Sequence, residues 1–211
     1  MKQRNMKKLI TIALGMFCAI TLAAQETKPL PKPNKKVKMS LFEALDKRQS
    51  VREYSDRDIS DNMLSQLLWA ACGINRPDEQ RITAPSAINA QDITVYVCRA
   101  DGAWRYDAAS HSLVKVSAKD LRTLVADRQE FAATAPVSLV MASNVSKVRN
   151  HSDLGAMDAG YVSENICLAC TALGLATVPR ATMNKEQLKK ELQLGDSDVL
   201  MLNNPVGYAK K

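Results

Sequence analysis

The feature that most constrains this chain is a stretch from about Asp153 to Leu173 with helical spacing and only three charged side chains, at positions 153, 158 and 164. Ala, Gly, Cys, Leu and Ile fill most of the rest, so a helix here is apolar around nearly its whole circumference. Such a helix must be covered on several sides. We expect a sheet to cover one side and a second subunit another, and Gly174 to end the helix.

Helices and strands alternate along the rest of the chain. Ser40 and Glu43 form a capping box that predicts a helix to about Lys47, and Ser60 opens a helix that Gly73 can end. Asn184 is expected to cap a later helix. Strands are predicted at 94–99, 137–141, 177–180 and 199–202, and a hairpin joins 104–106 to 113–116 around a turn at 107–112. This order indicates an α+β fold with a sheet flanked by helices.

The net positive charge of the chain comes from its first 38 residues. The formal net charge is +7, of which residues 1–24 and 25–38 carry +4 each, so the rest of the chain is close to −1. Binding to nucleic acid requires clustered cations on the folded surface. The charge pattern therefore argues against a nucleic-acid partner.

The first 24 residues have the pattern of a secretory signal. Four cationic residues precede an apolar run of 16 residues, Leu9 to Ala24, which ends in small side chains and is short for a bilayer span. We expect cleavage near residues 23–25 and export to a periplasm; an uncleaved membrane anchor is the alternative. In residues 25–38 three prolines alternate with lysines, which predicts a solvated linker before one folded domain at 39–211.

We interpret the cysteines outside the leader as buried apolar residues. Cys167 and Cys170 form a C-x-x-C pair, but they lie inside an apolar helical run rather than at a helix N-terminus, where a reactive thiol is expected. His111 and His151 have no partner at metal-ligand spacing, so no metal site is predicted. Both histidines, with Asp107, are interpreted as turn and surface residues.

The segment Arg48-Gln49-Ser50-Val51-Arg52 is the first that suggests chemistry. In an extended chain, residues 48, 50 and 52 point to one face. Two guanidinium groups and a hydroxyl on one face suit a phosphate. A solvated basic strand remains the alternative.

A second candidate segment, Thr83 to Gln91, precedes the strand at 94–99. Pro85-Ser86 predicts a turn that leaves backbone N–H groups and the Asn89 amide free to hold a planar ring with several acceptors. A plain turn with a helix cap is the alternative.

In their order and spacing these segments resemble the FMN-dependent nitroreductase family, and within it the branch of SagB-type dehydrogenases. The resemblance covers roughly residues 41 to 208 and includes FEALDKRQSVREYSDRDIS, RITAPSAINAQDITVYVC, DAGYVSENICLACTALGLATVPR and the final NPVGY. It implies a nitroreductase-like α+β fold with a central antiparallel or mixed sheet. It also implies a homodimer formed through the long central helices, with two FMN in the interface.

The resemblance also implies a set of flavin contacts. Arg48, Ser50 and Arg52 match the motif that meets the phosphate, the ribityl chain and the N1/C2=O edge of the ring. The other matching positions are Pro85, Ser86, Ala87 and Asn89 along the isoalloxazine, Pro179, Arg180 and Ala181 near N5 and O4, Gln129 near the flavin, and Lys210 with Lys211 at the phosphate.

Ping-pong two-electron transfer through flavin N5, to or from a small aromatic, quinone-like or heterocyclic substrate, is the implied activity. No protein side chain is then expected to be catalytic, because the flavin carries the chemistry. NAD(P)H is a possible donor, although export would separate the protein from cytoplasmic nicotinamides.

Three positions depart from the family pattern. Ile88 stands where a glycine is usual, Gln91-Asp92 stands for Gln-Pro, and the chain stops three residues after Tyr208. These departures leave open a binding or scaffolding protein that has lost flavin turnover.

Overall fold

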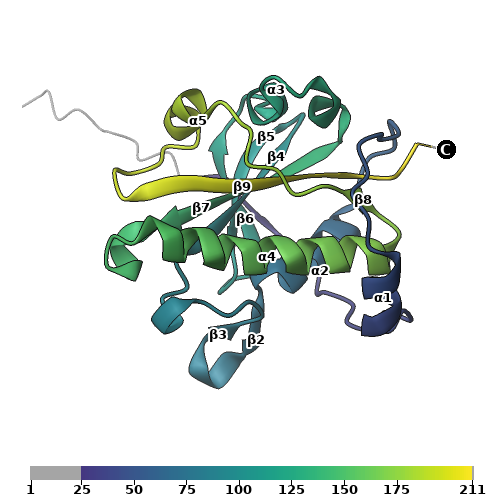
Figure 1. Ribbon diagram of the computed structural model, residues 1–211, viewed down its shortest axis with the longest axis horizontal. Coiled ribbons are helices and arrows are strands. Elements are labelled where there is room, and N and C mark those ends of the chain that lie inside the picture. Colours follow the sequence, from purple (N-terminus) through teal and green to yellow (C-terminus); the bar gives the residue numbers. More distant parts are fainter. Residues whose placement is uncertain (1–24, 211) are drawn as a thin grey trace, which may run out of the picture.

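The computed structural model describes residues 25–210; the predicted signal peptide and Lys211 lie outside the described residues. A seven-stranded sheet runs through the centre in the order β1-β6-β5-β4-β7-β9-β8 (Figure 1), and each neighbouring pair is antiparallel. Its strands are β1 (Thr27–Pro29), β4 (Ile93–Arg99), β5 (Gly102–Asp107), β6 (Ser112–Ser117), β7 (Val137–Asn144), β8 (Ala176–Thr177) and β9 (Asp198–Gly207). A separate short hairpin pairs β2 (Ile74–Arg76) with β3 (Arg81–Ile82).

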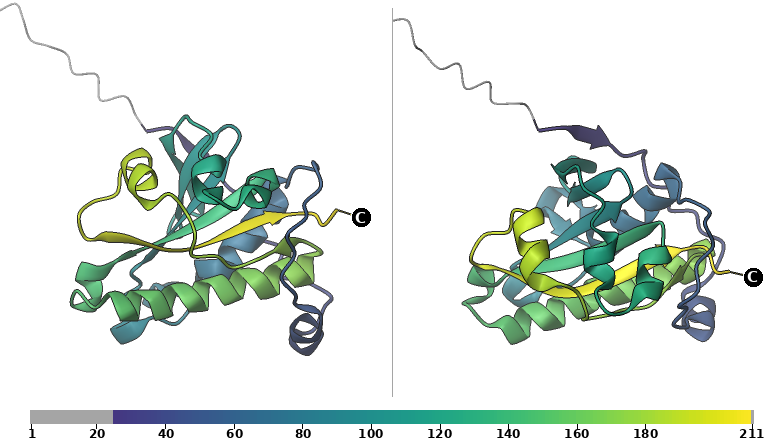
Figure 2. Two further views of the ribbon diagram at one scale, coloured as in Figure 1. Left: turned by 45° about the horizontal axis from the view of Figure 1, so that its top comes forward. Right: turned by 90° about the horizontal axis from the view of Figure 1, so that it is seen from above.

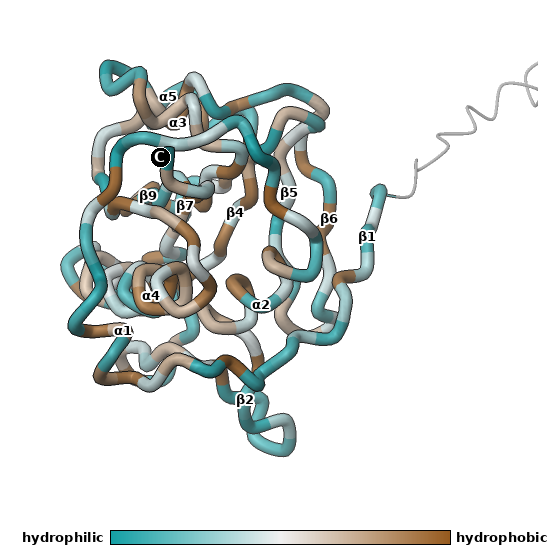
Figure 3. The backbone as a smooth tube through the Cα atoms, turned by 90° about the vertical axis from the view of Figure 1, so that its right-hand side faces the viewer, coloured by the Kyte–Doolittle hydropathy of each residue, from teal (hydrophilic) through white to brown (hydrophobic). Residues whose placement is uncertain are grey.

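Helices cover both faces of the sheet (Figure 2). The helices are α1 (Leu41–Lys47), α2 (Asp61–Cys72), α3 (Arg122–Ala126), α4 (Ser152–Leu173) and α5 (Lys185–Glu191). Seen end-on, α2 and α4 lie on one side of the strands, and α3 and α5 lie on the other (Figure 3). The expected α+β fold with a central antiparallel sheet flanked by helices is confirmed. Among the helices of residues 25–210, none has the length and hydropathy needed to cross a membrane.

Side chains of the central strands point alternately to the two faces of the sheet and contribute to a hydrophobic core on each face. In β4, Val95 and Val97 pack into the core under α2 and α4, whereas Tyr96 and Cys98 pack into the core under α3 and α5. Strand side chains alternate between the two faces of a sheet, so a continuous apolar run is what a strand covered on both faces requires.

The predicted helix ends are mostly confirmed. Ser40 and Glu43 form both hydrogen bonds of the capping box, and Ser60 and Asn184 accept from backbone N–H groups in their first turns. Gly174 ends α4 in the left-handed conformation, with φ of 72°. Helix α3 was not predicted, because its five residues are too few to show a period.

The solvated linker predicted at 25–38 is wrong in its first half. β1 pairs with β6 at the edge of the sheet, with Thr27 opposite Val114, and Leu30 is buried in the core. The prolines do not prevent this, because an edge strand needs donors on one side only.

The strand predicted at 177–180 is also shorter than expected. β8 ends at Thr177, and Arg180 returns as a single bridge to Asn203.

Candidate functional site

The Arg48–Arg52 segment leaves α1 as extended chain and runs beside the C-terminal residues. Val51 N–H donates to Thr177 O at 3.0 Å, and Lys210 N–H donates to Glu53 O at 3.1 Å. Val51 packs inward against a small apolar cluster that includes Tyr54, so its neighbours at 50 and 52 face outward. The structure therefore brings Arg48, Ser50 and Arg52 together with the start of the β8–α5 connection and with Lys210.

The polar side chains of this segment are free to bind a ligand. Arg48 is half-buried, whereas Ser50 and Arg52 are exposed. Within residues 25–210, none of the three side chains has a hydrogen-bond or ion-pair partner. Two unpaired guanidinium groups and a hydroxyl remain available for an anion such as a phosphate.

Arg48 lies against the C-terminal half of α4. Burial raises the pKa of the Cys167 thiol to about 11, and the nearby Glu164 carboxylate raises it further, whereas an Asn204 hydrogen bond and the Arg48 charge lower it. Cys167 and Cys170 are free and buried, which confirms the interpretation of this pair as small core residues.

The second predicted segment is a strained loop held by the other half of α4. Ala87 N–H donates to both carboxyl oxygens of Asp158, at 3.0 and 2.9 Å, and Gln91 N–H donates to Ser86 Oγ at 2.9 Å. Ile88, Asn89 and Gln91 have φ of 49°, 56° and 46°. Left-handed backbone is unfavourable for residues other than glycine, so the surrounding contacts must hold this loop in place.

One copy of the chain does not bring the two segments together. The loop is tied to α4 at Asp158, and Arg48 faces α4 at Cys167, nine residues further along. At 1.5 Å per residue these positions are about 14 Å apart along the helix axis. The predicted flavin contacts thus fall into two groups, here called half-sites, which lie toward different ends of one helix.

The Arg180 side chain is internal. It is 6% exposed and donates to Gln129 Oε1 at 2.7 Å, Asn203 Oδ1 at 2.8 Å, and the carbonyl oxygens of Val125 and Ala126 at 3.2 and 2.8 Å. Burial lowers its pKa. The guanidinium of Arg180 therefore binds the amide oxygen of Gln129 and two carbonyl oxygens of α3. Pro179 and Ala181, on either side of Arg180, are exposed, whereas the backbone N–H and C=O of Arg180 are paired with Asn203.

The surface interpretation of His111 is wrong. Its residue does lie in a turn, with φ of 48°, but the ring is half-buried and contacts Ser65 Oγ at 2.8 Å, Tyr106 Oη at 2.9 Å and Pro31 O at 3.2 Å. Burial lowers the pKa of His111. The sequence carries no signal for this network, because two of the three partners, Ser65 and Pro31, lie 46 and 80 residues away along the chain.

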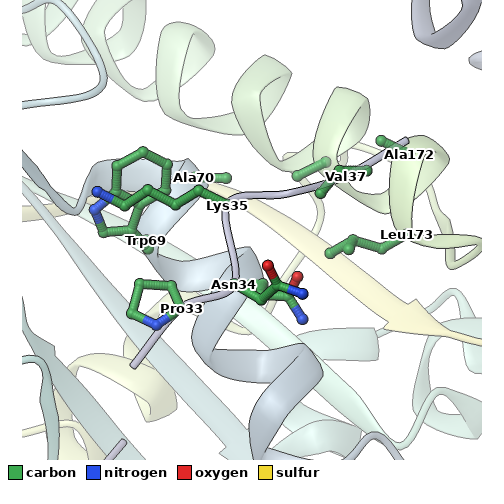
Figure 4. Close-up of a pocket in the computed structure, with 10 residues that line it drawn as sticks. Pro33, Asn34, Lys35, Val37, Trp69, Ala70, Ala172 and Leu173 are labelled. Atoms are coloured by element: carbon green, nitrogen blue, oxygen red, sulfur yellow. The ribbon is translucent and has the colours of Figure 1, made fainter. Parts of the chain in front are cut away.

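A pocket beside residues 33–37 is not the predicted site. The segment crosses α2, where Lys35 Nζ lies 4.1 Å from the centroid of the Trp69 ring (Figure 4). The pocket has a volume of about 110 Å³, well below the several hundred cubic ångströms of a usual cofactor site. None of the predicted flavin contacts lines it.

Comparisons with known proteins agree with this architecture. The model of the nitroreductase family matches residues 45–208. A protein of Methanocaldococcus jannaschii that is named as a nitroreductase is 32% identical over 184 residues, covering 80% of this chain and 91% of that protein.

Solved structures show the same fold. The crystal structure of a nitroreductase from Ralstonia eutropha has a TM-score of 0.83 and 32% identity, with 90% of this chain and 92% of that chain covered. An FMN-dependent nitroreductase of Clostridium difficile has a TM-score of 0.58 at 18% identity, with 80% and 87% covered. With its family match spanning most of the chain and two relatives at 32% identity, this protein belongs to the nitroreductase family.

Proposed function

We propose that this nitroreductase-family oxidoreductase uses FMN, and that Arg48, Ser50 and Arg52 hold the phosphate end of the cofactor. The observation that supports this most directly is that all three side chains lack a protein partner while lying beside Lys210. A fork of guanidinium donors with a neutral hydroxyl fits a phosphate in chemistry and charge. Membership of a family with FMN-dependent relatives points the same way.

Bound FMN supplies reversible two-electron transfer, which the protein side chains cannot perform. The chain contributes binding and orientation. Arg48 and Ser50 neutralise and fix the phosphate, and Arg52 places positive charge at the electron-accepting edge of the ring, which favours the reduced anion. Pro179 O and the Ala181 N–H, which have no backbone partner among the described residues, offer hydrogen-bonding groups to the ring. The substrate class that suits such a site is a small aromatic, quinone-like or heterocyclic compound.

We propose that the working unit is a homodimer. The half-sites at Asp158 and Cys167 face different ends of α4, so a two-fold axis across this helix would place the loop of one copy beside Arg48 of the other. Apolar side chains are exposed along the same surface: Met157 and Tyr161 on α4, Leu41, Phe42 and Leu45 on α1, and Ile88 in the loop. Phe42 is 82% exposed, which an isolated soluble domain rarely tolerates together with such neighbours.

We also propose export, which the cationic residues and 16-residue apolar run of the leader support. An exported enzyme would have no access to cytoplasmic NAD(P)H. Its electron donor would then be another reductant, or its substrate would be oxidised directly, as in the SagB-type branch that the sequence resembles. Comparing the N-terminal residue of the protein from periplasmic and cytoplasmic fractions tests the export proposal.

Titration of the purified protein with FMN tests the central proposal. We expect stoichiometric binding with a flavin absorbance spectrum, and loss of binding in the double variant Arg48→Ala and Arg52→Ala. The matched control removes two cations elsewhere, Arg76→Ala and Arg81→Ala on the β2–β3 hairpin, and should bind normally. A protein that takes up no FMN would instead favour a scaffolding role. Light scattering at micromolar concentration should give the mass of two chains.

A further inference from the structure

Two buried carboxyl groups meet beneath the loop at 85–91. Asp92 follows the loop and Asp158 lies on α4, and each residue is 1% exposed. Ser143 Oγ on β7 donates to Asp92 Oδ2, and Ala87 N–H donates to Asp158. Gly155, one helical turn before Asp158, packs against Ser143, the partner of Asp92, so the two carboxyl groups lie close together on the buried side of α4, and the Asp92 charge acts on Asp158.

Helix α4 packs tightly against β7 beside this pair. A Cβ at Gly155 would collide with Ser143 Oγ, so only glycine allows α4 to approach β7 this closely. Asp92 Oδ1 is buried and has no hydrogen-bond donor among the described residues other than a protonated neighbour. Two buried carboxylates this close together repel each other and lose hydration, which favours the form that carries one proton.

The charged groups near the pair do not neutralise it. Lys147, from the turn after β7, donates to Gln91 O at 3.2 Å rather than to either carboxyl. Arg105 and Asp107 of β5 line a groove with Gln91 on the other side of the loop, and Asp153 on α4 is exposed. Burial first, and then Asp92, raise the pKa of Asp158 to about 6, while the Ala87 N–H lowers it.

Asp92 stands where the family pattern that the sequence resembles usually has a proline. We propose that Asp92 and Asp158 are positioning residues that share one proton and thereby fix the strained loop 85–91. The inference deepens the proposed function and rests on it, because that function needs Ser86 and Asn89 held in one conformation toward the flavin. The shared proton satisfies Asp92 and leaves Asp158 free to accept from Ala87.

Amide exchange in the flavin-free protein tests the pair without the cofactor. While the loop is closed, Asp158 keeps its proton up to about pH 6, whereas in an open loop it loses the proton above about pH 4. Opening of the loop therefore becomes more favourable as the pH rises, and the protection factor of the Ala87 amide should fall about tenfold between pH 5 and pH 7. In Asp92→Asn the amide oxygen can accept from Ser143 and the N–H₂ can donate to Asp158. The fall should then be less than threefold. Asp153→Asn, on the exposed side of the same helix, is the control and should behave as wild type.

Equal pH dependence in wild type and Asp92→Asn, or no dependence in wild type, would overturn the shared proton. FMN titration adds the positioning readout: Asp158→Ala should weaken FMN binding at least tenfold, and Asp158→Asn, which keeps an acceptor for Ala87, should restore most of it. Unchanged binding in Asp158→Ala contradicts the positioning role. If wild type binds no FMN, the proposed function fails, and the exchange data still decide whether the proton is shared.

Discussion

Replacing Arg180 with methionine separates a structural role for this residue from a role in cofactor binding. Methionine keeps an apolar stem of similar length and removes every donor. Ala126 O keeps a second donor, Gln129 N–H at 3.0 Å, but Val125 O and Asn203 Oδ1 lose the guanidinium. A buried acceptor without a partner costs about 1–2 kcal/mol. Loss of two such partners predicts destabilisation by about 3 kcal/mol.

Urea unfolding of the flavin-free protein measures this effect. With a slope of about 2 kcal/mol per molar, the unfolding midpoint of Arg180→Met should fall by about 1.5 M. Arg128→Met is the matched control, since the Arg128 side chain is 88% exposed and its midpoint should not move. An Arg180→Met protein that unfolds with the wild-type midpoint but loses FMN would refute the reasoning and make this side chain a cofactor ligand.

Two further predictions follow from α4. Gly155→Ala should destabilise the protein by about 1–3 kcal/mol in urea unfolding, because the added Cβ would collide with Ser143. A Cβ at Gly160 meets nothing within 4 Å, so Gly160→Ala is the control and should be neutral or slightly stabilising. Since the folded state raises the pKa of Asp158 from its ordinary 3.8 to about 6, it holds a proton that the unfolded chain releases. The free energy of unfolding should therefore fall by about 2 kcal/mol as pH rises from 4 to 6, and by less in Asp92→Asn; equal pH profiles would contradict this.

The sequence predicts the fold well where the determinants are local. The capping box at Ser40 and the continuous apolar run of β7 depend on neighbours a few residues away, and both are confirmed. β1 was missed because its stability comes from pairing with β6, some 85 residues later, and the alternating prolines mask it.

The site shows the same division between local and distant determinants. Extended geometry around Ser50 was predictable from residue types. The internal position of the Arg180 guanidinium was not, since its acceptors come from α3 and β9. Asp92 did carry a signal, as a departure from the family pattern, but its meeting with Asp158 depends on how closely Gly155 lets α4 approach β7.

Helix α4 explains why the two half-sites need a second copy under the proposed function. The helix is continuous over 22 residues and packs on the sheet through Val162 and Ile166, so it acts as a rigid spacer between Asp158 and Cys167. A loop anchored at Asp158 by two hydrogen bonds cannot cross about 14 Å to Arg48 without breaking them. Rearrangement within one chain would therefore destroy one half-site to complete the other. Under the proposed function, two antiparallel copies of the same helix would complete both half-sites without any rearrangement, and would cover the Met157 and Tyr161 side chains that α4 exposes.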